Sequence, residues 1–116
     1  MDALLQGLER GSLEARADIL RALGRIGDPR ARGAVLMALD DENPRIRVGA
    51  IGAMRRLANE EDGPRLAAAL LDSDANVRMV ASSVLASVMT SGLREQTLML
   101  LQHPSPDARA AAAQVL

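Results

Sequence analysis

Apolar residues in three stretches of the chain recur with the spacing of an amphipathic helix. Each stretch has apolar side chains at positions i, i+4, i+7, i+8 and i+11, which matches the 3.6-residue period of an α-helix. The three stripes are Ala15, Ile19, Ala22, Leu23 and Ile26; Ile46, Ala50, Ala53, Met54 and Leu57; and Val77, Ala81, Val84, Leu85 and Val88. The pattern therefore predicts three long helices, each with one apolar face.

The stripes are copies of one another, displaced by 31 residues, and polar residues precede them at the same phase. The residues in this polar column are Ser12, Asn43, Asp74 and Ser105. All four are good N-cap residues, and Pro, which is favoured at the first helical position, follows the second and fourth. The column predicts four helices, here called A helices, that start near residues 13, 44, 75 and 106. Turn-forming residues at 27–29, 59–64 and 90–92 end the first three.

Shorter apolar segments alternate with the A helices and predict B helices at residues 2–10, 29–40, 63–71 and 92–102. The third starts near Gly63, because Pro64 inside a helix would remove a backbone hydrogen bond. Their predicted core columns are Leu4, Val35, Leu66 and Thr97; Leu5, Leu36, Ala67 and Leu98; and Leu8, Leu39, Leu70 and Leu101. The third column is Leu in every copy, which predicts packing between layers.

The alternation of B and A helices predicts an all-α fold, an α–α superhelix or solenoid of about eight helices in stacked antiparallel pairs. We expect a single domain over residues 1–116, with repeats at 12–42, 43–73 and 74–104 and partial repeats at 1–11 and 105–116. Small residues such as Gly49 and Gly52 should let neighbouring layers approach closely. No polar capping helix closes the pattern at Leu116. We expect a fragment of a longer solenoid or larger protein, or an end that packs on something, as in end-to-end self-association.

The composition narrows the class of protein. With 48% apolar residues, 25% charged residues and a net charge of −1, the chain is too apolar to be disordered. It has neither a membrane-spanning run nor a signal-peptide pattern, so we expect a cytoplasmic protein. The absence of Cys excludes disulfides and thiolate chemistry. The fourteen basic residues, all Arg, are interspersed with fifteen acids and no aromatic residue, which argues against nucleic-acid binding.

Two segments, ALGRIGDPRA at residues 22–31 and LMALDDENPRIR at residues 36–47, resemble HEAT repeats. The similarity is to the short bacterial type also found in phycobilisome lyases, and it extends from about Asp2 to Leu116. The resemblance implies two-helix repeats with the A helices on the convex side and the B helices on the concave side. It also implies a ladder between repeats, in which Arg16 meets Asp41 and Arg47 meets Asp72.

The ladder arginines form a column of their own, Arg16, Arg47, Arg78 and Arg109, spaced by 31 residues. An Arg near a helix start can fork onto a carboxylate and nearby carbonyl groups while its stem covers apolar surface. The column therefore predicts a structural role. Anion binding is the alternative, because helix N-termini attract negative charge.

No catalytic constellation is found, so we expect a protein that is not an enzyme and that uses no cofactor or metal. His103, the single His, lies in a loop before a cap residue, where we expect a solvated side chain. The acidic runs at 40–42 and 60–62 lack the ligand spacing of a calcium loop.

The side of each B helix opposite the Leu column is the candidate binding surface. Its candidate contact residues are Gln6, Arg10, Met37, Asp41, Arg65, Asp72, Gln96 and Met99. The methionines are the best apolar contacts, because flexible Met suits adaptable binding surfaces. We expect a non-catalytic scaffold that binds a protein or peptide on the concave face, with no nucleic-acid or membrane partner. The alternatives, which rest on family similarity, are part of a bilin-lyase-like enzyme and a nucleic-acid-binding protein similar to HEAT-like DNA glycosylases.

Overall fold

The computed structural model describes residues 2–87, 95, 98–99 and 102–115, and over these residues the chain forms helices joined by short turns, with no strand. The all-α fold predicted from the sequence is confirmed. The chain divides into two compact units, Met1–Leu57 and Ala58–Leu116. The B helix predicted at 92–102 and the turn predicted at 90–92 fall largely or wholly outside the described residues.

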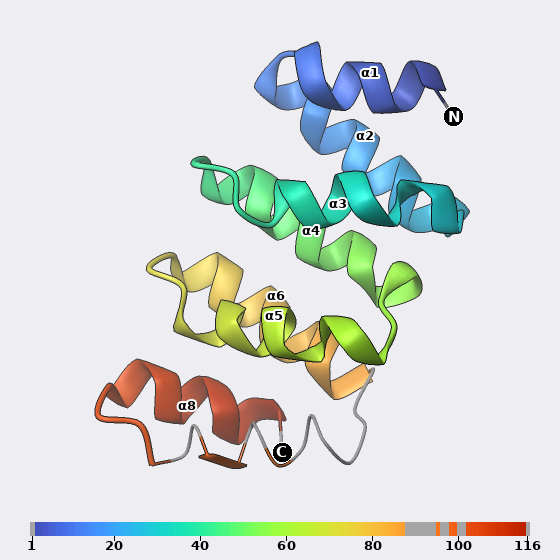
Figure 1. Ribbon diagram of the computed structural model, residues 1–116. Coiled ribbons are helices and arrows are strands. Elements are labelled where there is room, and N and C mark those ends of the chain that lie inside the picture. Colours follow the sequence, from blue (N-terminus) through green and yellow to red (C-terminus); the bar gives the residue numbers. More distant parts are fainter. Residues whose placement is uncertain (1, 88–94, 96–97, 100–101, 116) are drawn as a thin grey trace. The chain divides into compact units, whose positions relative to one another are not determined.

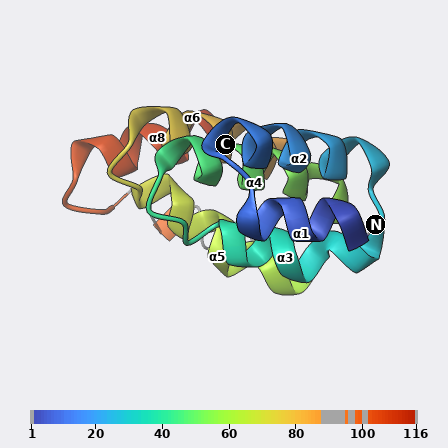
Figure 2. The same ribbon diagram turned by 90° about the horizontal axis from the view of Figure 1, so that it is seen from above.

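The first unit consists of two stacked helical hairpins. Helix α1 (Asp2–Arg10) packs on α2 (Leu13–Ile26), and α3 (Arg32–Ala38) packs on α4 (Pro44–Leu57). The hairpins join through α2 and α4, so that α1 and α3 form one layer and α2 and α4 the other (Figures 1 and 2). Stacked helix pairs of this kind are the building unit of an α-solenoid.

The second unit is built around α6 (Ala75–Ser87). This helix packs on α5 (Gly63–Ala68), on the 3₁₀ turn η3 (Ala69–Leu71) and on α8 (Pro106–Val115). As predicted, α5 begins at Gly63, with Pro64 in its first turn, where the missing backbone N–H costs no helical hydrogen bond.

The A helices start at residues 13, 44, 75 and 106, where the polar column predicts them. Ser12 Oγ accepts a hydrogen bond from the Ala15 N–H at 3.2 Å, and Asn43 Oδ1 accepts one from the Arg45 N–H at 2.9 Å. Asp74 Oδ1 accepts from the N–H groups of Asn76 and Val77 at 2.8 and 3.1 Å. These side chains satisfy backbone donors that have no partner within the helix, which fixes each helix start.

The B segments contain tighter turns than the sequence pattern indicates. The second begins with the 3₁₀ turn η1 (Pro29–Ala31) before α3, and the third ends in η3 after α5. Asp28 starts η1 by accepting the Arg30 N–H at 2.9 Å, and it also receives the Arg30 guanidinium at 2.7 Å. Each of these two B segments therefore has only a short α-helical part.

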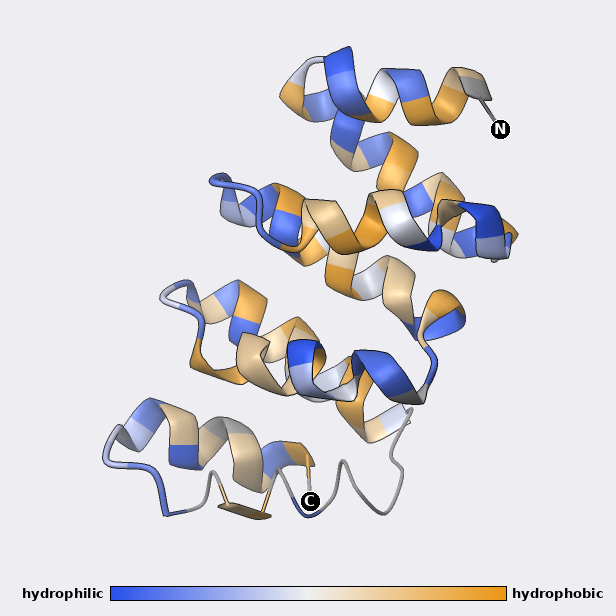
Figure 3. Ribbon diagram, in the orientation of Figure 1, coloured by the Kyte–Doolittle hydropathy of each residue, from blue (hydrophilic) through white to orange (hydrophobic). Residues whose placement is uncertain are grey.

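Apolar and polar residues alternate along the long helices, as the colours of the ribbons in Figure 3 show. In α4 the whole predicted stripe is buried. A further column, which the stripe pattern missed, is also buried: Leu20, Ile51 and Ser82 are 0%, 1% and 5% exposed. The Ser82 hydroxyl donates to the Arg78 carbonyl at 3.1 Å, which satisfies the polar member of this column.

Two predicted core residues are exposed. Ile26 is 56% exposed, because α2 ends there and the chain turns away at Gly27, whose φ of 67° is left-handed. Leu98 is 43% exposed. In its column, Leu5 and Leu36 are half-buried and Ala67 is buried, so burial at this position varies from copy to copy.

Glycine allows the close approach of α2 and α4. A Cβ atom on Gly24 would lie 2.9 Å from the Ala53 Cα atom, and one on Gly49 would lie 3.2 Å from Leu20 Cδ1. The predicted use of small residues is confirmed at Gly49, and Gly24 is a further position of close approach that the sequence pattern did not indicate. Gly52, in contrast, faces open space, because a Cβ atom added there would meet no neighbouring atom within 4 Å.

Candidate interaction surface and arginine contacts

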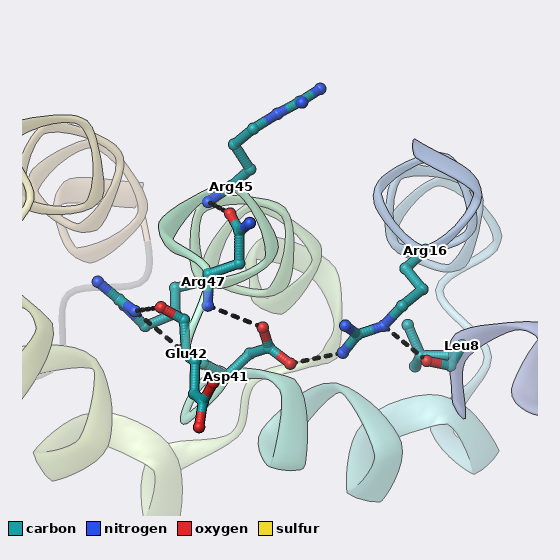
Figure 4. A network of polar contacts seen from close by, with 7 residues as sticks. Leu8, Arg16, Asp41, Glu42, Arg45 and Arg47 are labelled. Atoms are coloured by element: carbon teal, nitrogen blue, oxygen red, sulfur yellow. Dashed lines mark hydrogen bonds and ion pairs between the residues drawn. The ribbon is translucent and has the colours of Figure 1, made fainter. Parts of the chain in front are cut away.

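Arg16 joins the two hairpins of the first unit (Figure 4). From α2, its NH2 group donates to Asp41 Oδ1 at 2.6 Å, and its Nε–H donates to the Leu8 carbonyl at 2.9 Å. The Arg16 and Asp41 side chains are 25% and 20% exposed. One guanidinium thus connects α1, α2 and the loop before α4, which is the first of the two ladder contacts that the resemblance implies.

Asp41 shapes its own loop while it receives Arg16. Its Oδ2 atom accepts the Asn43 N–H at 2.9 Å, which closes a tight turn just before α4. The hydrogen bond from Arg16 and then that from the Asn43 N–H hold the pKa of Asp41 below its ordinary value of 3.8, against the opposing effect of burial. The carboxylate is therefore held ionised by the contacts that fix the loop.

The other three ladder arginines share a contact with backbone carbonyl groups. The NH1 groups of Arg47, Arg78 and Arg109 each donate to the carbonyl oxygen of the residue six positions earlier, at 2.8, 2.7 and 2.9 Å. In Arg47 and Arg109 the same NH1 also donates to the next carbonyl oxygen, at 3.0 Å. Each arginine thus ties the start of its A helix to the loop before it.

The second implied ladder pair, Arg47 with Asp72, joins residues of different units and stays a prediction. Within the second unit, Arg78 NH2 reaches Asp107 Oδ2 at 3.8 Å, and the Asp107 side chain is 74% exposed. This contact links α6 to the first turn of α8.

The side chains six positions before Arg47, Arg78 and Arg109 share a further role, which the sequence pattern did not indicate. Asp41 Oδ2 and Asp72 Oδ1 accept the N–H of the residue two positions later at 2.9 Å, and His103 Nδ1 does the same with the Ser105 N–H at 3.0 Å. The signal in the sequence is a hydrogen-bond acceptor two residues before the N-cap in these three copies. Rather than being merely solvated, the half-buried His103 therefore helps to form its loop.

One column of the candidate surface is exposed in every copy. The column is Gln6, Met37, Ala68 and Met99, and all four residues are exposed, with Met37 at 78% and Met99 at 74%. On α3, Met37 lies opposite the buried face of Val35 and Ala38. Arg10 and Arg65 are also exposed, whereas Gln96 lies outside the described residues. We call these exposed residues the B-segment surface: Gln6, Arg10 and Met37 of the first unit, and Arg65, Ala68 and Met99 of the second.

Asp41 and Asp72 differ from the rest of the candidate set. Both are half-buried, and their carboxylates accept backbone hydrogen bonds in the loops. Within the described parts of the chain, no group of three His, Asp or Glu residues could hold a metal ion. No helix there is long and apolar enough to cross a membrane.

A comparison with protein families supplies the classification. The family model for HEAT repeats matches residues 1–86, which is most of the chain. The chain belongs to the HEAT-repeat family. HEAT repeats generally serve as scaffolds for protein interactions. A comparison of this HEAT-repeat protein with curated proteins finds no match. The phycobilisome-lyase subtype stays a prediction from the sequence.

Proposed function

We propose that this HEAT-repeat protein is a non-catalytic scaffold that binds a protein or peptide on the B-segment surface, the concave face that the family resemblance implies. The observation that carries the proposal is the exposure of Met37 and Met99 at the same repeat position. The two methionines belong to the second and fourth B segments, with Ala68 at this position in the third. A repeat protein that presents equivalent side chains in several copies can contact an extended partner at several points.

The chemistry of the two methionines supports this role. A Met side chain that is three-quarters exposed contributes little to the folded core, yet it offers a large, flexible apolar contact to a partner. On the B segments of the first unit, Gln6 and Arg10 supply polar groups besides Met37, and on those of the second unit Arg65 does so besides Met99. Such groups can bind a partner's backbone or carboxylates. Apolar anchors within a polar rim are typical of protein interfaces.

The arginine contacts also favour a protein partner over a nucleic acid. Arg16, Arg47, Arg78 and Arg109 each donate to a carbonyl group within the chain, and Arg16 also pairs with Asp41. Guanidinium groups held in this way are poorly placed to fork onto phosphate oxygens. The fifteen acidic residues against fourteen arginines add no net positive field.

The test is a selection of peptides from a displayed random library on the purified full chain, followed by titration of the selected peptides. We expect M37E/M99E to bind them at least about tenfold more weakly, since a charge at the centre of an apolar contact costs more than about 1.4 kcal/mol. The matched control is M79E, which changes an exposed methionine of α6 that is 61% exposed and lies outside the surface. Equal losses in M37E/M99E and M79E, or no loss in M37E/M99E, would contradict the proposed surface.

A further inference from the structure

All the sulfur of the chain is in methionine, and the described methionines differ widely in their exposed fraction. Of the six methionines, Met37, Met54, Met79 and Met99 are among the described residues. Met37 and Met99 are 78% and 74% exposed, Met79 is 61% exposed, and Met54 is fully buried in α4. The two most exposed thioethers of this set are thus those of the B-segment surface.

No other side chain competes strongly for a mild two-electron oxidant. The chain has no Cys, no Trp and no Tyr, which are the other side chains that oxidants commonly attack. Accessibility and thioether chemistry therefore direct a peroxide to the exposed methionines.

We propose that Met37 and Met99 are sites of reversible oxidation by hydroperoxides, and that forming their sulfoxides switches off partner binding at the B-segment surface. The switching half of this inference rests on the proposed function, whereas the modification half rests on exposure alone. Methionine sulfoxide is polar and chiral, so it removes the flexible apolar contact that the thioether provides.

The reaction balances with hydrogen peroxide as the oxidant. A lone pair of the thioether sulfur attacks one peroxide oxygen, so that the O–O bond breaks and an S–O bond forms. Sulfur loses two electrons, and the departing oxygen gains them. The proton of the attacked oxygen passes to the departing oxygen, which leaves as water. A methionine sulfoxide reductase returns the thioether with two electrons and two protons from a thiol reductant, which becomes a disulfide, and the oxygen leaves as water, so the change is reversible.

The fold should survive this oxidation. Met37 extends from the outer side of α3, away from the buried Val35 and Ala38, so a polar oxygen there enters no core contact. Met54 is the described methionine whose oxidation would disrupt packing, and it has no exposed surface. Oxidation can therefore change the binding surface without unfolding the chain.

The modification is tested on the full chain with hydrogen peroxide, tryptic digestion and mass spectrometry over time. Cleavage after Arg places Met37, Met54 and Met99 in separate peptides, at residues 33–45, 48–55 and 95–109. We expect Met37 and Met99 to oxidise at least about tenfold faster than Met54, and the rates to converge in denaturant. Similar rates for Met37 and Met54 in the folded chain, or unfolding when Met37 and Met99 are oxidised, would overturn the inference.

The switch is tested with the peptides selected on the unoxidised chain. We expect oxidation to weaken binding at least about tenfold and the reductases to restore it. Peroxide should weaken binding by M79L as it does for the wild type. It should leave M37L/M99L unchanged, whatever affinity that variant starts from. Unchanged affinity after oxidation of Met37 and Met99, or an equal loss in M37L/M99L, would overturn the switch. If the unoxidised chain binds no peptide, the proposed function fails, while the site-resolved rates still decide the modification.

Discussion

The two units repeat one sequence pattern, but they stabilise it with different contacts. In Met1–Leu57 the buried column that the stripe pattern missed holds Leu20 and Ile51, whereas in Ala58–Leu116 it holds Ser82. In the first unit the repeats are joined by the half-buried ion pair of Arg16 NH2 with Asp41 Oδ1, at 2.6 Å. In the second unit the corresponding contact is between Arg78 NH2 and Oδ2 of the exposed Asp107, at 3.8 Å. The shared features are the caps and the arginine contacts with backbone. Copying a repeat thus preserves how each hairpin begins, while the strength of stacking varies from copy to copy.

The largest expected difference between the two units is in the stability lost when a residue of the buried column of Leu20, Ile51 and Ser82 is replaced. Leu20→Ala should lower the free energy of unfolding by about 2–5 kcal/mol, because it leaves a cavity between packed helices. Ser82→Ala should cost less than about 1.5 kcal/mol, because Ala is the better helix former and little volume is lost. Urea denaturation of both variants measures the contrast. Equal costs would mean that the two positions are packed alike.

A matched pair of glycines tests the close approach within the first unit. Gly24→Ala should destabilise by about 1–3 kcal/mol, because the new Cβ atom meets the Ala53 backbone. Gly52→Ala should instead stabilise by about 0.5–1 kcal/mol, because its Cβ atom meets open space and Ala favours the helix. Thermal unfolding of the two variants provides the comparison, and stabilisation by Gly24→Ala would show that α2 and α4 are not tightly packed.

Double-mutant cycles compare the two ion pairs directly. The coupling free energy of Arg16 with Asp41 should be about 1 kcal/mol or more, since both side chains are largely covered. For Arg78 with Asp107 it should be below about 0.3 kcal/mol, because Asp107 is exposed and the charges are screened. Arg→Met and Asp→Asn substitutions serve both cycles. Equal coupling energies would remove this difference between the units.

The pH dependence of stability should report on Asp41. Its native pKa is depressed, so its contribution to stability is complete above the unfolded value of 3.8 and is lost as the pH falls through the native pKa. We expect Asp41→Asn to flatten the stability curve below about pH 4 relative to the wild type. Asp28, whose pKa the Arg30 side chain and backbone N–H lower to about 2, is a second group that titrates in this range. Asp28→Asn is measured alongside, so that the contribution of Asp28 to the acid slope is separated from that of Asp41. An unchanged acid slope in Asp41→Asn would contradict the depressed pKa of Asp41.

The smallest predicted effect concerns the loop of the last repeat. His103→Asp should raise the free energy of unfolding by about 0.5 kcal/mol, because a carboxylate can accept the Ser105 N–H and also favours the N-terminus of α8. The reverse exchange in the first unit, Asp41→His, should destabilise, because it also removes the partner of Arg16. Chemical denaturation at about pH 7 measures both. Destabilisation by His103→Asp would show that the loops are not equivalent.

The sequence predicts the helix starts and the Arg column well, because caps and side-chain forks depend on residues close in the chain. It fails where burial depends on neighbouring layers. A single stripe describes a helix with one covered face, whereas α4 packs against both α2 and α3 and so buries Ile51 as well. Ile26 shows the opposite error, because a helical period carries no information about where the next turn takes the chain.

In the candidate surface, the sequence indicates which B-helix side faces away from the Leu column but not how its polar members are used. Asp41 and Arg10 look alike in the pattern, as polar residues on one outer face. The contact with Arg16, which depends on tertiary packing, and the local bond from the Asn43 N–H together show that Asp41 is held in its loop. The column of Gln6, Met37, Ala68 and Met99 is exposed in every copy, whereas in the column of Arg10, Asp41 and Asp72 only Arg10 is exposed, so a repeated position does not fix exposure by itself.

The arginine contacts with loop carbonyl groups have a consequence for how such a chain can change. Arg47 binds the carbonyl oxygens of an Asp and a Glu, while Arg109 binds those of a His and a Pro. Every residue type carries a carbonyl oxygen, so the guanidinium holds the loop without specifying which side chains occupy it. Loop sequences can therefore diversify around a fixed Arg, and a protein engineer could randomise Glu42 or Pro104 and keep the hairpin connection intact.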